Sequence, residues 1–281
     1  MTQWNGVDYI YDALKRLSRV DSGQASWFHL YTAGGERIWS IFEPGDLLQP
    51  LAETFSLRSP SGQVLRRYFV SSGLGQETWE WASDQVFGIG GLVASVHPQG
   101  QGESTRHYHL DHLGSPRLVT DTSGNKLFGH TFLPYGEEVT DPSQSDSPFR
   151  FTGHERDFQF GTGLDDQDYM HARYYTPHLG RFGRVDPVRG SASAPQSLNR
   201  YGYVLGNPMR YLDPSGLTEC DFMGCEPTGW GPELPWWVQD SLYYAQLFLT
   251  NLEELPGSIG RLLNLESVEH QDDVQERIDG N

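Results

Sequence analysis

The segment YHLDHLGSPRLVTDTSGNKLFGHTFLPYG, residues 108–136, decides the fold of this 281-residue chain. It places two turn clusters, Gly114-Ser115-Pro116 and Thr122-Ser123-Gly124-Asn125, between short runs of β-branched and aromatic residues. Such runs favour strands, and clusters of Gly, Asn, Ser and Pro favour tight turns. The segment therefore predicts consecutive β-hairpins.

Similar patterns occur earlier in the chain. They are YDALKRLSRVDSG (11–23), YTAGGERIWS (31–40) and LRSPSGQVLRRYFV (57–70), in an overall composition of 32 Gly, 17 Pro and 36 aromatic residues. One hairpin cannot bury a face by itself, whereas stacked hairpins can. We therefore predict a mainly β fold over residues 1–217, built as an array of antiparallel hairpins.

The charge of the chain is concentrated near its end. Of the net charge of −17, residues 218–281 carry −11, from 13 acidic residues and 2 arginines. This balance argues against nucleic-acid binding, which needs a basic face, and fits either a basic partner or a solvated acidic end. Cys220 and Cys225 could form a local disulfide but cannot supply a four-ligand zinc site. No signal peptide and no membrane span are expected, because no apolar stretch is long enough.

Several motifs carry a resemblance to a known family. YDALKRLSRV resembles a YD repeat, and YHLDHLGSPRLVTD, FTGHERD, ARYYTPHLGRF and the segment from Val185 to Leu217 resemble the RHS repeat-associated core domain. The resemblance is most specific over 107–217, is consistent over 8–70 and does not extend past Leu217. It implies a YD/RHS β strip, forming here a partial shell, because two or three repeats cannot enclose a cavity.

The resemblance also implies an organisation and a setting. We expect a YD-repeat strip over 1–106, the core over 107–217 and a variable acidic tail over 218–281. The family includes bacterial toxin-delivery proteins and toxin-complex C subunits. The resemblance therefore implies that the protein is secreted or located at the cell surface. Expected partners are its own tail, an upstream RHS shell chain or a secretion-system component.

In several bacterial family members the core cuts itself after the last Leu of an Asp-Pro-x-Gly-Leu motif. Here the resemblance places the cut between Leu217 and Thr218, with Asp186 and Asp213 as catalytic carboxylates and Arg184 or Arg181 as charge support. Two close carboxylates share a proton, so the ionised one can activate water while the protonated one polarises the carbonyl group.

A purely structural interpretation fits the same residues. Asp-Pro-Ser-Gly suits a type I turn, with Asp first, Pro second and Gly fourth. Asp186-Pro187 suits a turn as well, and so does a third Asp-Pro pair at Asp141-Pro142. Spacing alone does not place Asp186 beside Asp213.

Other constellations favour structure over chemistry. His107, His109, His112 and Asp111 could ligate a metal, but we prefer a strand and turn, with His107 and His109 on one strand face. LDDQD (164–168) lacks the Gly and final Glu of a calcium loop, so a solvated acidic loop is expected. HERDF lacks the second His of a zinc-protease helix. No metal or cofactor is expected. Aromatic side chains could stack on carbohydrate, although packing within the strip is the commoner use.

The tail has a different pattern. After a Pro- and Gly-rich connector, apolar residues recur at helical spacing, namely Val238, Leu242, Ala245, Leu249 and Leu252. Pro256-Gly257 ends this predicted helix, and a second one starts with Ser258 as its cap. The pair could be an effector, a docking element or a cap on the β strip.

The leading interpretation is the C-terminal part of an RHS-type protein, a β scaffold that presents its tail or releases it by aspartyl self-cleavage. The alternatives are a non-catalytic cell-surface or carbohydrate-binding YD-repeat module and a truncated RHS remnant. Cleavage separates the first interpretation from the second.

Overall fold

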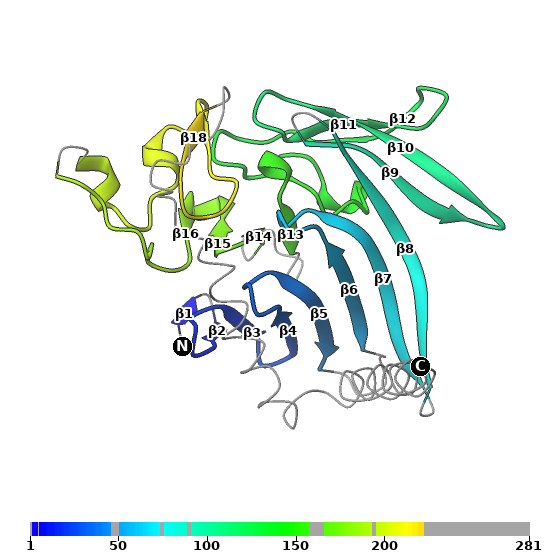
Figure 1. The fold of residues 1–281 in the computed structure, drawn as a ribbon, viewed down its shortest axis with the longest axis horizontal. Helices are drawn as coiled ribbons and strands as arrows, with labels where there is room; N and C mark the ends of the chain where they lie inside the picture. Colours follow the sequence, from blue (N-terminus) through cyan, green and yellow to red (C-terminus); the bar gives the residue numbers. More distant parts are fainter. Residues whose placement is uncertain are drawn as a thin grey trace, which may run out of the picture.

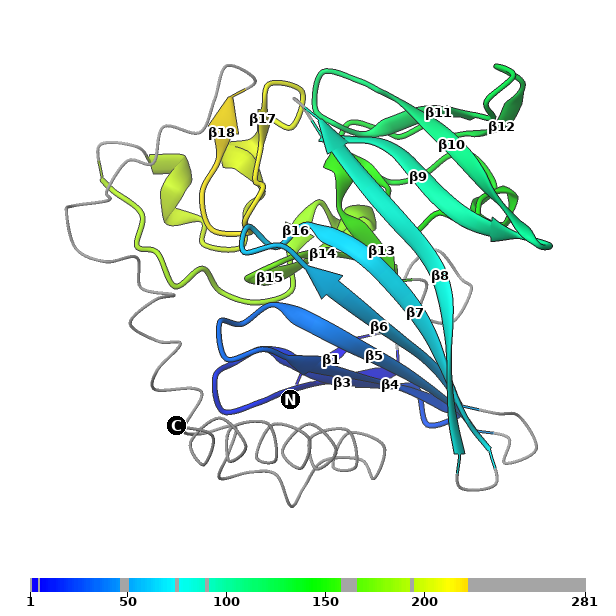
Figure 2. The same ribbon diagram turned by 45° about the vertical axis from the view of Figure 1, so that its right-hand side comes forward.

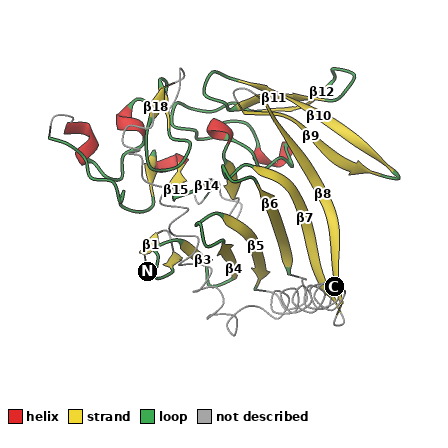
Figure 3. Ribbon diagram, in the orientation of Figure 1, coloured by secondary structure: helices red, strands yellow, loops and turns green. Residues whose placement is uncertain are grey.

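The computed structural model describes residues 2–4, 6–45, 51–73, 76–88, 91–157, 166–192 and 195–221. Within them the protein is mainly β, as predicted, and its helical parts are five short 3-10 turns (Figure 3). No helix in these ranges is long and apolar enough to cross a membrane. The predicted helices of the tail and Cys225 lie outside the described residues, whereas Cys220 is disulfide-bonded.

Twelve strands form one sheet in strict sequence order, so every strand pairs with its neighbours in the chain (Figure 1). This is the predicted array of antiparallel hairpins. The strands are β1 (Thr2–Trp4), β2 (Val7–Tyr11), β3 (Leu17–Asp21), β4 (Ala25–Tyr31), β5 (Arg37–Pro44), β6 (Ala52–Arg58), β7 (Val64–Gly73), β8 (Gln76–Gly88), β9 (Gly91–Gln99), β10 (Gly102–Leu110), β11 (Pro116–Thr120) and β12 (Lys126–Gly129). The boundary expected between 106 and 107 falls inside β10, and the sheet continues to Gly129.

The described residues after Gly129 form a smaller unit against this strip. Its elements are β13 (Glu155–Asp157), β14 (Gln167–Met170), β15 (Arg173–Thr176) and β16 (Arg181–Phe182) in one sheet, β17 (Tyr211–Leu212) and β18 (Cys220–Asp221) in another, and the 3-10 turns η1 (Pro142–Gln144), η2 (Phe151–Gly153), η3 (Pro177–Leu179), η4 (Pro195–Leu198) and η5 (Val204–Gly206). Figures 1 and 2 show this unit between the first strands of the curved strip and β9 to β12.

Apolar and aromatic side chains join the two parts. Tyr169 and Tyr174, on β14 and β15, pack with Val7, Leu17 and Val20 from the first strands. Phe149 likewise joins a cluster of strip residues: Val64, Leu92, Tyr108, Val119 and Phe128. Because both clusters contain buried residues from the strip and from the smaller unit, the two parts share a core.

One turn recurs along the strip and matters for the site. In Asp-His-Leu-Gly-Ser (111–115), the amide of the first residue, Asp111, donates to the carbonyl of the fifth, Ser115, at 2.9 Å. The Asp111 side chain in turn accepts from the Ser115 amide at 3.0 Å. The fourth residue, Gly114, has a φ of +83°, which glycine adopts without strain. We call this the repeat turn. Four other segments make the same two bonds: 12–16, 32–36, 59–63 and 121–125.

Candidate functional site

The predicted cleavage site lies in a repeat turn that is not closed. Residues 213–217, here called the seam turn, connect to β17 and β18, which pair antiparallel through Leu212 and Cys220. Asp213 Oδ1 accepts from the Leu217 amide at 3.0 Å, which is the side-chain bond of every repeat turn. Gly216 has a φ of +73°, and a Cβ there would lie 2.2 Å from the Met170 carbonyl oxygen, so only glycine fits.

The hydrogen bond that the seam turn lacks is the backbone bond to the Leu217 carbonyl, which belongs to the predicted cleavage site. In the five repeat turns the fifth carbonyl accepts from the first amide. Among the residues the structure describes, no hydrogen bond joins the Asp213 amide to the Leu217 carbonyl, and none reaches that carbonyl from elsewhere. The Leu217 carbonyl therefore differs from its counterparts at Ser115 and Asn125, which are both bonded.

Asp213 makes a further contact that the other turns lack. Its Oδ1 also accepts from the Thr218 amide at 3.0 Å, and the Thr218 nitrogen is the atom that would leave if the Leu217–Thr218 bond were cut. The residue is only 3% exposed. Burial raises the pKa of Asp213 to about 6, against the opposing effects of Arg173 and the amides of the turn. A carboxyl group with this pKa can donate a proton near neutral pH.

Arg173, at the start of β15, brings the two predicted carboxylates together. Its Nη2 lies 2.8 Å from Asp186 Oδ2 and 3.5 Å from Asp213 Oδ2. Its Nε donates to the Gly216 carbonyl in the seam turn. The guanidinium carbon lies 3.6 Å from the centre of the Phe182 ring. One buried arginine thus contacts both carboxylates and the residue before the scissile one.

Asp186 combines the structural role with the contact to Arg173. Its Oδ1 accepts from the Val188 amide at 2.7 Å, which makes the predicted turn around Pro187. Its amide donates to the Arg200 carbonyl at 2.9 Å. By contrast, Asp141 caps η1 by accepting from the Ser143 amide. The described part of the chain gives Asp141 no arginine partner.

This geometry differs from the expected pair of carboxylates in two respects. Arg173 lies between them, and the pKa of Asp213 is raised by burial rather than by the charge of Asp186. The expected support residues make their direct contacts with other groups, although Arg184 also interacts electrostatically with Asp186. Arg184 donates to the Lys15 carbonyl, and Arg181 lies over the Tyr201 ring at 5.8 Å.

Arg173 was not predicted as a site residue, although it lies in the quoted segment ARYYTPHLGRF. Nothing in its spacing from Asp186 or Asp213 could reveal the contact, because the fold rather than the local sequence brings β15 to the seam turn.

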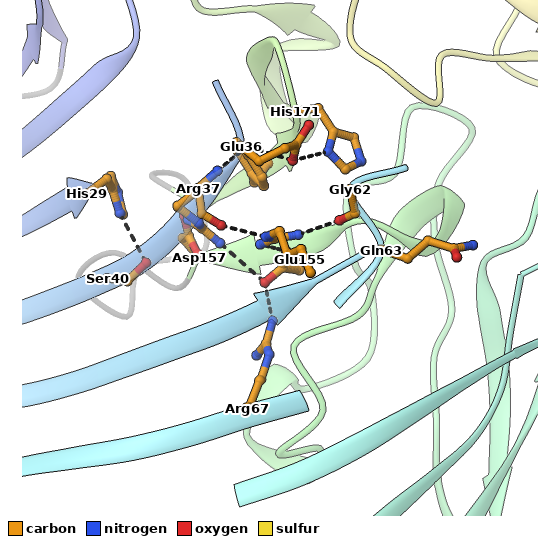
Figure 4. Close-up of polar contacts among 12 residues, drawn as sticks. His29, Glu36, Arg37, Ser40, Gly62, Gln63, Arg67, Glu155, Asp157 and His171 are labelled. Atoms are coloured by element: carbon orange, nitrogen blue, oxygen red, sulfur yellow. Dashed lines mark hydrogen bonds and ion pairs between the residues drawn. The ribbon is translucent and has the colours of Figure 1, made fainter. Parts of the chain in front are cut away.

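A buried charge cluster fixes the smaller unit to the strip (Figure 4). Glu155 on β13 accepts from three strip arginines, namely Arg37, Arg58 and Arg67. Arg37 also pairs with Asp157. Although burial opposes it, the three arginines hold the pKa of the Glu155 carboxyl well below its usual range. Because all of these side chains are largely buried, removing one partner leaves charge uncompensated.

The hairpin that carries Arg173 is attached to the strip near this cluster. At its tip, His171 Nδ1 lies 2.8 Å from Glu36 Oε2 (Figure 4). On β14, the Tyr169 hydroxyl accepts from the Arg37 amide at 2.8 Å. On the other side of the same tip, the Ala172 amide donates to the Ser215 carbonyl at 3.0 Å. The β14–β15 hairpin therefore links the seam turn to the strip.

The histidines of the RHYHLDH segment lie as the structural interpretation predicts. His107 and His109 are exposed on β10, on either side of the buried Tyr108. His109 Nε2 lies 3.1 Å from Thr120 Oγ1, and His112 Nε2 lies 3.0 Å from the Met209 carbonyl. Within the described ranges, no group of three or more side chains is arranged to hold a metal ion.

The prediction of a solvated acidic loop at 164–168 is wrong for the described residues 166–168. Asp168 is fully buried on β14, opposite Arg156 on β13, and the pair makes bonds of 2.7 and 3.0 Å. Asp166 is buried as well, and burial raises its pKa to about 6. The acidic residues compensate a buried arginine, which a linear sequence does not reveal.

No family model matches the chain, but searches of curated proteins find relatives. Salivary gland surface protein 1 of Aedes aegypti is 29% identical over 219 residues, which cover 73% of this chain and 6% of that protein. Double-stranded DNA deaminase toxin A of Burkholderia cenocepacia is 33% identical over 134 residues, 46% of this chain and 9% of the toxin. Toxin subunit YenC2 of Yersinia entomophaga is 32% identical over 119 residues, 41% and 11% of the two chains. The chain thus spans 6 to 11% of the length of these relatives.

Solved structures show the same fold. The crystal structure of TcdB2-TccC3 matches with a TM-score of 0.60 and 23% identity, over 76% of this chain and 10% of that chain. A structure of TcdB2-TccC3 without its hypervariable C-terminal region matches with a TM-score of 0.57 and 22% identity, over the same shares.

Proposed function

We propose that this chain, a member of the RHS-type YD-repeat family, is a delivery scaffold that presents the segment after Leu217 and severs it by hydrolysing the Leu217–Thr218 bond. The observation that carries the proposal is the open seam turn. It keeps the side-chain bond of a repeat turn but leaves the scissile carbonyl without the usual partner among the described residues. Its carboxyl group contacts the leaving nitrogen instead.

The chemistry assigns one role to each acidic residue. A water molecule attacks the carbonyl carbon of Leu217, and the Asp186 carboxylate takes a proton from that water. As the carbon becomes tetrahedral, the Thr218 nitrogen gains a lone pair within reach of Asp213. Protonated Asp213 then donates its proton to this nitrogen, and the C–N bond breaks. One water is consumed, Leu217 ends in a carboxyl group and Thr218 begins with an amine.

Arg173 orients this group of residues. By donating to the Gly216 carbonyl it fixes the backbone next to the scissile bond, and by contacting both carboxylates it holds them on one side of the turn. Its burial strengthens these contacts, because charge-assisted hydrogen bonds are stronger where water is excluded.

The comparisons support a delivery role. Three relatives carry the word toxin in their names, namely the two reported above and toxin protein Tse5 of Pseudomonas aeruginosa, and one structural neighbour is described as lacking a hypervariable C-terminal region. We propose that residues 218–281 correspond to such a variable segment. We further propose that the protein is secreted and works with an upstream RHS shell chain or a secretion-system component.

A second candidate function has one observation in its favour. The match to a salivary gland surface protein covers more of this chain than the three toxin matches do. A non-catalytic surface module, binding a partner such as carbohydrate, would need the strip but no cut. Cleavage therefore distinguishes the two functions.

The test compares wild-type chain with the variant Asp213→Asn by denaturing gel and N-terminal sequencing. Asn keeps an oxygen for the Leu217 and Thr218 amides but has no acidic proton to transfer to the leaving nitrogen, so the variant is expected to stay intact. Asp121→Asn changes the same position of a closed repeat turn and should leave the cut unaffected. Ser59→Asp converts the 59–63 turn to the Asp-Pro-Ser-Gly pattern, and Arg58 already donates to its Gly62 carbonyl, as Arg173 does to Gly216. Because the bond from the Ser59 amide to the Gln63 carbonyl closes this turn, no new cut is expected. An uncut wild type, or a cut in Asp213→Asn, would refute the proposal.

A further inference from the structure

His154 lies buried behind the seam turn and contacts it directly. It follows η2 in the segment FTGHERD and is 7% exposed. Its Nε2 lies 3.3 Å from the Pro214 carbonyl oxygen, and its Nδ1 lies 2.8 Å from Thr152 Oγ1. The proposed cleavage mechanism assigns no role to this side chain.

The two partners of His154 fix the position of its proton. A carbonyl oxygen only accepts, so Nε2 must carry the hydrogen of that bond. Burial lowers the pKa of His154 to about 4, so the ring is neutral at physiological pH and Nδ1 is an acceptor. The Thr152 hydroxyl therefore donates to Nδ1, and the imidazole N–H points at the seam turn.

Thr152, whose hydroxyl donates to His154, has an unfavourable backbone conformation. Its φ is +52°, which a β-branched residue rarely adopts. Its amide donates to Ser115 Oγ at 2.8 Å, and the Ser115 side chain is buried. Backbone strain of this kind persists where the surrounding structure enforces it, and it is common at functional sites.

Three consecutive carbonyls of the seam turn are held from outside the turn. Pro214 is bonded by His154, Ser215 by the Ala172 amide and Gly216 by Arg173. A repeat turn is closed by its own backbone bond instead. An arginine also bonds the fourth carbonyl of the closed turns 12–16 and 59–63, at Lys15 and Gly62. The bonds that set the seam turn apart are therefore those to Pro214 and Ser215, from His154 and Ala172.

We propose that His154 is a positioning residue for the cut, an inference that rests on the self-cleavage proposed above. Its N–H holds the Pro214 carbonyl, and this contact keeps the seam turn open so that the Leu217 carbonyl stays available to water. It does not touch the reacting atoms, and it takes no part in proton transfer.

The experiment follows cleavage of the full chain made by cell-free synthesis. Replacing the ring by His154→Ala removes one buried neutral hydrogen bond and should slow the cut by about fivefold. His154→Gln can place an amide N–H near the position of Nε2, and it should restore most of the rate. His112→Ala removes a similar bond to the carbonyl of Met209, outside the seam turn, and should leave the rate unchanged. Unfolding by urea, measured for each change in an Asp213→Asn background, reports stability separately.

The outcomes distinguish a failure of the proposed self-cleavage from a failure of the role of His154 alone. If wild-type chain is never cut, the proposed function fails and this inference fails with it. If wild-type chain is cut and His154→Ala is cut at the same rate, only the role of His154 fails. The inference is also overturned if Gln slows the cut as much as Ala does while both variants lose the same stability, because His154 would then be merely structural. Slow cleavage in Ala with recovery in Gln supports it.

Discussion

The pH dependence of cleavage follows from the burial of Asp213. The proposed role of this residue requires its protonated form, and its pKa is about 6. About nine-tenths of the molecules are then protonated at pH 5, about one-tenth at pH 7 and about one-hundredth at pH 8. We therefore expect the first-order rate constant to fall about tenfold between pH 5 and pH 7 and about ninefold more by pH 8.

The assay uses labelled full-length chain from cell-free synthesis, shifted to each pH and then sampled on a denaturing gel. The Asp121→Asn variant should follow the same profile as the wild type, since its turn has no contact with Arg173. The direction of the effect is the decisive point. A rate that rises with pH between 6 and 8, as Asp213 loses its proton, would refute its assignment as the acid that protonates the Thr218 nitrogen.

Three further predictions concern the surroundings of the seam turn. Arg173→Lys keeps a positive charge, but a lysine cannot bond the Gly216 carbonyl and both carboxylates at the same time. Cleavage in the same gel assay should therefore slow at least about tenfold, and an unchanged rate would contradict the role of the guanidinium. Gly216→Ala should abolish the cut, because its φ is positive and the new Cβ would clash with the Met170 carbonyl, and a cut at the normal rate would show that the turn tolerates another shape. Glu155→Gln should lower the free energy of unfolding by about 3–5 kcal/mol in urea titrations of the uncut Asp213→Asn chain, since it leaves three buried arginines poorly compensated. The pKa of Glu155 is lower in the folded state than in the unfolded state. The carboxylate therefore stabilises the fold at neutral pH, and this stabilisation is lost as the pH falls below the usual range of a glutamate. The stability difference caused by Glu155→Gln should thus shrink in acid, and a difference that stays constant would contradict this sign.

The hairpin strip could be predicted from local sequence because each hairpin is specified within a few residues. A turn such as Asp121 to Asn125 contains its own acceptor side chain and its own glycine. The strands on either side alternate β-branched and aromatic residues. Strand order follows directly, because neighbours in the chain pair with each other.

The candidate site could be predicted only in part. Asp186, Asp213 and the bond after Leu217 were identified through the family resemblance, and the structure brings both carboxylates to one arginine. Arg173 could not be predicted, because its contact with Asp213 depends on how β15 packs against the seam turn, 40 residues further along the chain. The same is true of the buried Asp168, whose partner Arg156 lies twelve residues earlier and across a strand pair.

The open state of the seam turn was also beyond sequence reasoning. The segments 59–63 and 213–217 share the letters Pro-Ser-Gly at the same positions, yet only the first is closed by its backbone bond. The two turns differ in the donors from distant parts of the chain, His154 and the Ala172 amide, that bond the Pro214 and Ser215 carbonyls of the second turn.

The central claim is that the chain hydrolyses its own Leu217–Thr218 bond. Intact mass under denaturing conditions, on chain synthesised in ¹⁸O-enriched water, tests it most directly. We predict two fragments, the smaller beginning at Thr218 and the larger ending at Leu217 with ¹⁸O from the attacking water in its new carboxyl group, together with one uncut species for Asp213→Asn. A single uncut wild-type chain, or a cut at any other bond, would contradict the account.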